Sequence, residues 1–217
     1  MNFCSKLSTL GAALVLTTAF ASADPLQISS FATGTSVGAY NGSTQFVGVD
    51  STTVQLLNTG TVASGEWAPA IGNSQWVSYG DTGPAGPITS PNNVTYTYTT
   101  TFTLDAANYA GTLQVLADDT TDVWLNGHLL QGFSASGNDN QCQQNTPNCV
   151  TPLTLTLDSF FVAGLNTLTF DVEQTGGGAQ GLDFDGTISQ TPEPSSLLLL
   201  GTGLIGSAGA LFRRMRA

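Results

Sequence analysis

Short runs in which apolar residues alternate with polar ones, mostly threonine, dominate residues 24–190. Gly, Asn and Pro separate these runs, and no long stretch has the 3.6-residue period of an amphipathic helix. About nine to eleven short strands at this spacing predict an all-β fold with a single β-sandwich or jelly-roll domain. The strands are expected at 26–31, 46–49, 53–57, 75–79, 95–104, 112–117, 123–125, 128–130, 151–157, 165–172 and 182–188.

Two local patterns add detail to this prediction. In the 95–104 run, five alternating residues should share one face, namely Tyr96, Tyr98, Thr100, Phe102 and Leu104. Asn126-Gly127 stands between two runs and predicts a hairpin, because a type I′ turn needs positive φ at both central residues.

The N-terminal segment has the pattern of a secretory signal. Lys6 precedes an uncharged apolar run at 7–20, and Ala21-Ser22-Ala23 is a small-x-small site that a signal peptidase accepts. We expect cleavage after Ala23, which leaves Asp24 as the mature N-terminus. A permanent N-terminal anchor is the alternative, although the apolar run is short for one.

The C-terminal segment has three parts in order. Pro192-Glu193-Pro194 precedes an uncharged, mostly apolar run at 195–212, and Arg213, Arg214 and Arg216 follow it. The run is near the lower length limit for a spanning helix, so a transmembrane helix is expected at about 195–212. The arginine cluster favours a cytoplasmic C-terminus in the inner membrane, with the body outside.

This order of elements in residues 192–217 closely resembles the PEP-CTERM sorting signal of Gram-negative bacteria. The resemblance implies processing by an exosortase, a membrane-embedded transpeptidase-like enzyme, after transient membrane anchoring. It also implies delivery to the cell surface or the extracellular space, often with exopolysaccharide and biofilm matrix. A plain membrane anchor is the alternative. The chain then divides into a signal peptide (1–23), an extracellular domain (24–190) and a sorting segment (191–217).

The second half of the body resembles galactose-binding-like jelly rolls. The resemblance lies in the strands at 98–104 and 111–117, the acidic turn after them, the 123–127 hairpin and the Gly-x-Asn-x-Leu entry at 164–168. It implies the fold more than the ligand. This chain also has no arginine of the kind that often holds a sugar hydroxyl in that family.

The charge distribution excludes several partners. No Lys or Arg occurs between Leu7 and Phe212, whereas residues 24–190 carry all the Asp and Glu except Glu193, which is 15 − 1 = 14. Without cations the body cannot neutralise phosphates, so nucleic acid is not expected as a partner, and anionic lipids and nucleotides are disfavoured. Divalent cations are compatible with such a surface.

Cys142 and Cys149 are the cysteines that remain after signal removal. An even pair in an exported protein predicts a disulfide. Free thiols or a metal site are the alternatives.

Asp118, Asp119 and Asp122 crowd one turn and are weak candidates for a structural calcium ion, the one cofactor considered. An acidic turn whose side chains bond the backbone is the alternative. Asp183 and Asp185 should share one face of the last strand, where they face water or join a metal site.

Candidate ligand-binding side chains are few. Trp67 lies in a Gly/Pro-rich loop and is the candidate glycan contact, whereas Trp76 and Trp124 are expected in the core. Glu66 beside Trp67 is the best acid for a hydrolase, and His128 follows the hairpin turn and should be a surface residue. No catalytic residue is predicted.

These patterns together predict an exported, non-enzymatic surface or matrix protein with a structural or adhesive role. A module that binds extracellular polysaccharide is the first alternative, and a secreted hydrolase is the second.

Overall fold

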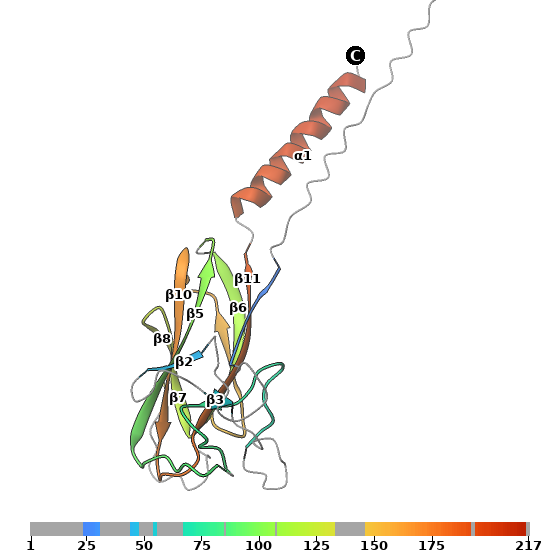
Figure 1. Ribbon diagram of the computed structural model, residues 1–217. Helices are drawn as coiled ribbons and strands as arrows, with labels where there is room; N and C mark the ends of the chain where they lie inside the picture. The colour runs from blue at the N-terminus through green and yellow to red at the C-terminus, as the bar shows by residue number, and fades with distance from the viewer. Residues whose placement is uncertain are drawn as a thin grey trace, which may run out of the picture.

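The computed structural model describes residues 24–30, 44–47, 54–55, 67–84, 86–106, 108–132, 146–191 and 194–215. These residues form two antiparallel sheets that face each other, and helix α1 leaves from one end of the sandwich (Figure 1). The elements are β1 Leu26–Ser29, β2 Thr44–Val47, β3 Val54–Gln55, β4 Val77–Ser78, β5 Val94–Leu104, β6 Tyr109–Asp118, β7 Thr120–Leu125, β8 His128–Gln131, β9 Leu153–Leu157, β10 Gly164–Gln174, β11 Gly181–Gln190 and α1 Pro194–Met215.

Sheet A has the order β3-β4-β11-β6-β9, and β1 pairs with β11 beside β4. Sheet B has the order β2-β5-β10-β7-β8. Each strand expected from the sequence is present, and the ends of most differ by a few residues. The all-β prediction is therefore confirmed, including the hairpin between β7 and β8, where Asn126 and Gly127 have φ of 50° and 79°.

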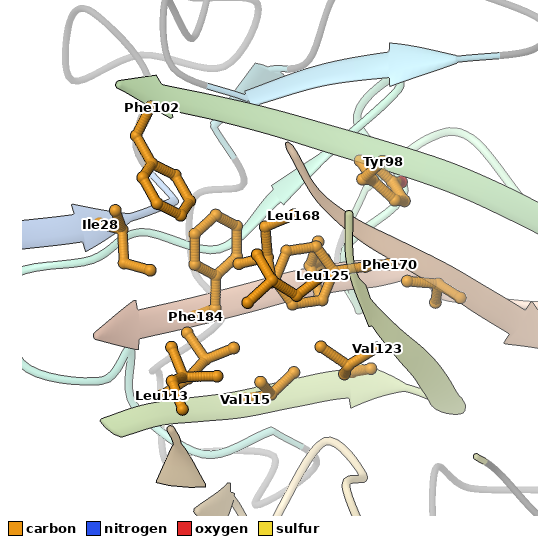
Figure 2. Close-up of a cluster of buried hydrophobic side chains, with 14 of the residues drawn as sticks. Ile28, Tyr98, Phe102, Leu113, Val115, Val123, Leu125, Leu168, Phe170 and Phe184 are labelled. Carbon is orange, nitrogen blue, oxygen red and sulfur yellow. The ribbon is translucent and has the colours of Figure 1, made fainter. Parts of the chain in front are cut away.

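The core lies between the two sheets and contains inward side chains of β1, β4, β5, β6, β7, β9, β10 and β11. All five alternating residues predicted to share a face of β5 are buried. Phe170 of β10 stacks on Phe184 of β11 with ring centroids 4.5 Å apart, which joins the two sheets at the centre (Figure 2). Large apolar side chains with little or no exposure surround this pair, including Ile28, Leu113, Val115, Val123, Leu125 and Leu168.

A second apolar cluster lies on the opposite side of sheet A. Leu116 of β6 is covered there by Trp67 and Trp76, whose ring centroids are 4.2 Å apart, and by Cys149. The segment 67–76 therefore packs on the sheet through its two tryptophans.

Asp183 of β11 lies beneath this same segment and is fully buried, so the expectation that it faces water is wrong. Its Oδ2 accepts a hydrogen bond from the Ile71 amide at 2.8 Å. Its Oδ1 lies 2.5 Å from Ser74 Oγ and 3.0 Å from Ser30 Oγ. Hydroxyl and amide donors thus replace the water that the carboxylate loses on burial.

Desolvation raises the pKa of Asp183 from 3.8 to about 6, and the hydrogen bonds from Ser74, Ile71 and Ser30 limit the rise. The Asp183 carboxylate therefore binds a proton more tightly in the folded protein than in the unfolded chain. The resulting stabilisation is complete below the unfolded pKa of 3.8 and is lost as the pH rises through about 6.

We therefore predict that Asp183 lowers the free energy of unfolding by on the order of 3 kcal/mol between pH 4 and pH 7. Asp183→Asn should remove most of this pH dependence, because the amide does not ionise. Urea unfolding at several pH values measures the effect, with the exposed Asp158→Asn as the control. If the free energy of unfolding of Asp183→Asn changes with pH as steeply as that of the wild type, the Asp183 carboxyl is not the responsible group.

Candidate functional site

The junction between the sandwich and α1 is held firmly on the sandwich side. β11 pairs with β6 as far as Gln190, which lies opposite Tyr109. The next residue, Thr191, donates its amide to the Asn108 carbonyl at 2.9 Å and accepts from Asn108 Nδ2 at 2.8 Å. Ordered pairing therefore continues to the residue before the Pro-Glu-Pro sequence.

Helix α1 begins at Pro194, a favourable first position because proline lacks only an amide hydrogen that the helix would not use. Arg213 and Arg214 lie in its last turn, where positive charge complements the helix dipole. The helix expected at about 195–212 is therefore present. Among the residues described, however, no helix combines the length and the apolar character needed to cross a membrane.

Several predicted residues lie outside the described ranges. They are Ala21 and Ala23 of the signal site, Glu66, Cys142, and Pro192, Glu193 and Arg216 of the tail. Asp24 is described and exposed, and Cys149 is buried in the second cluster. The Cys142–Cys149 pairing stays a prediction.

The acidic turn does not bring its three aspartates together. Asp118 ends β6 and accepts from Trp67 Nε1 at 2.7 Å on the outer side of sheet A. Asp119 is buried and accepts from the Thr175 amide at 2.5 Å and from its hydroxyl at 2.9 Å. Asp122 lies on the other sheet, on β7, opposite Asp171 of β10.

No group of three or more His, Cys, Asp or Glu side chains in the described ranges is arranged to hold a metal ion. The sequence-based calcium candidate therefore gains no support from these residues. The bond from the Thr175 amide to Asp119 agrees with the alternative of an acid that bonds the backbone, whereas Asp118 bonds the indole of Trp67.

In its described residues, the outer face of sheet B combines hydroxyls and carboxylates with an aromatic ring. Trp124 of β7 is half-buried there, between its strand partners Thr169 and Leu129. Its Nε1 is buried and has no hydrogen-bond partner within the described part of the chain. The same face also carries Thr95, Thr97, Thr99, Thr101 and Thr103 of β5, Leu165, Thr167, Thr169, Asp171 and Glu173 of β10, Asp122 of β7 and Leu129 of β8.

Negative charge concentrates on one part of this face. Thr97 Oγ1 donates to Asp171 Oδ1 at 2.6 Å, which orients that carboxylate. Partial burial raises the pKa of Glu173, and the charges of Asp119 and Asp122 raise it further. The face therefore offers an aromatic surface beside several acceptors of hydroxyl hydrogens.

The structure reverses the roles expected for two tryptophans. Trp67, the predicted glycan contact, is 4% exposed, and its indole nitrogen is bonded to Asp118. It cannot present a stacking surface, because segment 67–76 folds back onto sheet A. Trp76 is buried as expected, whereas Trp124 is not a core residue.

His128 is exposed at the start of β8, as predicted. Its ring stacks on Phe160 with centroids 4.2 Å apart and planes 7° apart. This contact joins the hairpin to the loop between β9 and β10.

Comparison with known proteins identifies the tail but not the body. Residues 190–216 match the family model described as the PEP-CTERM protein-sorting motif. No curated protein sequence matches the chain. A crystal structure of selenomethionine-labelled β-glucosidase from Kluyveromyces marxianus is similar to 77% of this chain at 12% identity with a TM-score of 0.28, and this chain spans 20% of that enzyme.

A TM-score this low gives no support for the galactose-binding-like prediction or for an activity. The match to the sorting motif, by contrast, confirms the resemblance of the C-terminal segment to PEP-CTERM signals. It indicates an exported protein that carries a C-terminal membrane-anchored sorting signal for an exosortase.

Proposed function

We propose that this protein is a non-enzymatic structural or adhesive component of the bacterial cell surface or extracellular matrix, associated with exopolysaccharide. The observation that carries the proposal is the sorting motif at residues 190–216, which begins at the last residue of β11. Signal peptidase removes residues 1–23, the tail holds the precursor in the inner membrane with a cytoplasmic C-terminus, and an exosortase then cleaves at the motif.

The sandwich is well suited to release from its tail. The hydrogen bonds of β11 are made to β1, β4 and β6, and Thr191 is bonded to Asn108. Removal of α1 therefore breaks no strand pairing. It also removes Arg213, Arg214 and Arg216, so the mature protein contains no Lys or Arg and has a formal net charge of 0 − 14 = −14.

A second candidate function is polysaccharide binding on the outer face of sheet B. The observation that favours it is the partly exposed Trp124 beside Asp122 and the threonine rows. The accessible part of the indole supplies a flat apolar surface, and neighbouring hydroxyls and carboxylates supply hydrogen-bond partners for sugar hydroxyls.

Replacement of Pro192, Glu193 and Pro194 by alanine should abolish processing at the tail. In a Gram-negative host that has an exosortase, the wild-type chain should lose both terminal segments, whereas the variant should keep the mass of residues 24–217. Intact mass spectrometry measures both cleavages. Pro87→Ala, an exposed proline in the sandwich, is the control and should be processed normally. Normal processing of the triple variant would refute sorting through this motif.

Trp124→Ala should weaken binding to the host's exopolysaccharide about tenfold, on the order of 1.4 kcal/mol, if the outer face of sheet B is the binding surface. Polysaccharide pull-down or calorimetry measures the affinity. Ile88→Ala, at an exposed apolar position outside the strands of sheet B, is the control and should bind as the wild type does. Equal affinity in the Trp124 variant would exclude this face.

A further inference from the structure

We propose that segment 158–166, which is the loop between β9 and β10 together with the first three residues of β10, docks on the lipid surface of the membrane that holds the tail before cleavage. We call this segment the docking loop. The inference rests on the tail-mediated anchoring proposed above. It adds a contact made by the sandwich itself, which orients the cleavage junction relative to the membrane.

The docking loop concentrates exposed apolar side chains. Phe160 is 44% exposed, Val162 44% and Leu165 64%. In the described part of the sandwich, the other large apolar side chains with comparable exposure are spread over separate segments, at Ile88, Leu129 and Val150. Three such residues within one short loop indicate a contact surface.

The docking loop lies at the end of the sandwich from which α1 leaves (Figure 1). It follows Leu157, which pairs with Gly111, and includes Gly164, which pairs with Leu104. Phe161 in its middle is buried, with its ring centroid 6.4 Å from those of both Phe102 and Tyr109. Since Tyr109 is the strand partner of Gln190, the loop is anchored beside the exit of the chain.

The junction leaves little slack between this end and the tail. Thr191 is hydrogen-bonded to Asn108, and α1 begins three residues later at Pro194. A fully extended chain advances at most about 3.6 Å per residue, so these three steps span roughly 11 Å. A tail fixed in the membrane therefore keeps the docking loop close to the lipid surface.

Backbone polar groups of Phe160 and Val162 in the docking loop are hydrogen-bonded to protein side chains, so they do not depend on water. Asn126 Nδ2 donates to the Phe160 carbonyl at 2.8 Å. Asn166 accepts from the Val162 amide at 3.0 Å and donates to the Val162 carbonyl at 2.8 Å. Polar backbone groups that are paired internally cost little when water leaves, and unpaired ones cost several kcal/mol.

The aromatic ring of Phe160 is held in an exposed position. Its backbone φ is 66°, a value unusual for a bulky residue, and its ring stacks on His128. Asp158, at the first position, is the one charged residue of the docking loop. The remaining positions are uncharged, so the docking loop has no cation that would attract anionic lipids. The sandwich as a whole is acidic and is repelled by an anionic surface, which favours a zwitterionic lipid surface.

The test uses the full chain reconstituted in phosphatidylcholine vesicles that contain a photoactivatable phosphatidylcholine and no exosortase. Flotation first reports whether the tail holds the protein in the membrane. Illumination and mass spectrometry then map the lipid-labelled peptides. We expect labelling in 158–166 and background labelling in 86–93, which includes the exposed Ile88.

A triple variant, Phe160→Asn, Val162→Thr and Leu165→Thr, should lower labelling of the docking loop about fivefold or more, because membrane affinity scales with the apolar area buried. Asn tolerates the positive φ at position 160, and Thr preserves the β-branched shape or the strand propensity at the other two positions. Ile88→Thr is the matched control and should leave labelling unchanged.

Three results would overturn the inference. Failure of the chain to float would refute tail anchoring and this contact together. Flotation with labelling of 158–166 no greater than that of 86–93 would refute the docking loop alone, and would assign its apolar side chains to a protein partner. Labelling that persists in a folded triple variant would also refute it, and if that variant does not fold, the wild-type comparison of the two peptides decides.

Discussion

The sandwich has no Lys or Arg with which to neutralise a buried carboxylate, because neither occurs between Leu7 and Phe212. Buried acids must therefore be stabilised by neutral donors. Asp183 receives the Ile71 amide, Asp118 receives the Trp67 indole, and Asp119 receives the Thr175 amide and hydroxyl. Two of these three contacts hold segment 67–76 on sheet A. Because no Lys or Arg is present, the packing of segment 67–76 on sheet A depends on neutral donors that bond Asp118 and Asp183.

The strands could be predicted from the sequence because their signals are local. A period of two separates the inward and outward residues of β5, and the Asn126-Gly127 pair specifies its own turn through two positive φ angles. The order of strands in the sheets carries no comparable local signal. β11 pairs with β1, more than 150 residues earlier in the chain, and this pairing depends on packing of the whole core.

Burial of individual polar and aromatic residues was harder to predict. Trp67 and Asp183 are buried because a loop folds over the outer side of sheet A, and a loop position gives no periodic signal. Trp124 is different, because Val123 and Leu125 flank it and both are fully buried. Alternation alone places Trp124 on the opposite face. The prediction that Trp124 lies in the core followed the general preference of tryptophan for buried positions, whereas the alternation in the strand indicated the outer face.

β11 links the stability of the sandwich to its processing. Phe184 stacks on the other sheet, Asp183 holds the covering loop, and the same strand continues to the sorting motif at residue 190. Because the strand is paired along its full length, a cut beyond Thr191 releases the tail without exposing an unpaired strand in the core. The junction between β11 and α1 is short. In the proposed membrane-anchored precursor, the end of the sandwich at which β11 stops would therefore face the membrane. Strand order thereby determines which loops lie at the same end of the sandwich as the sorting motif, among them the segment between β9 and β10.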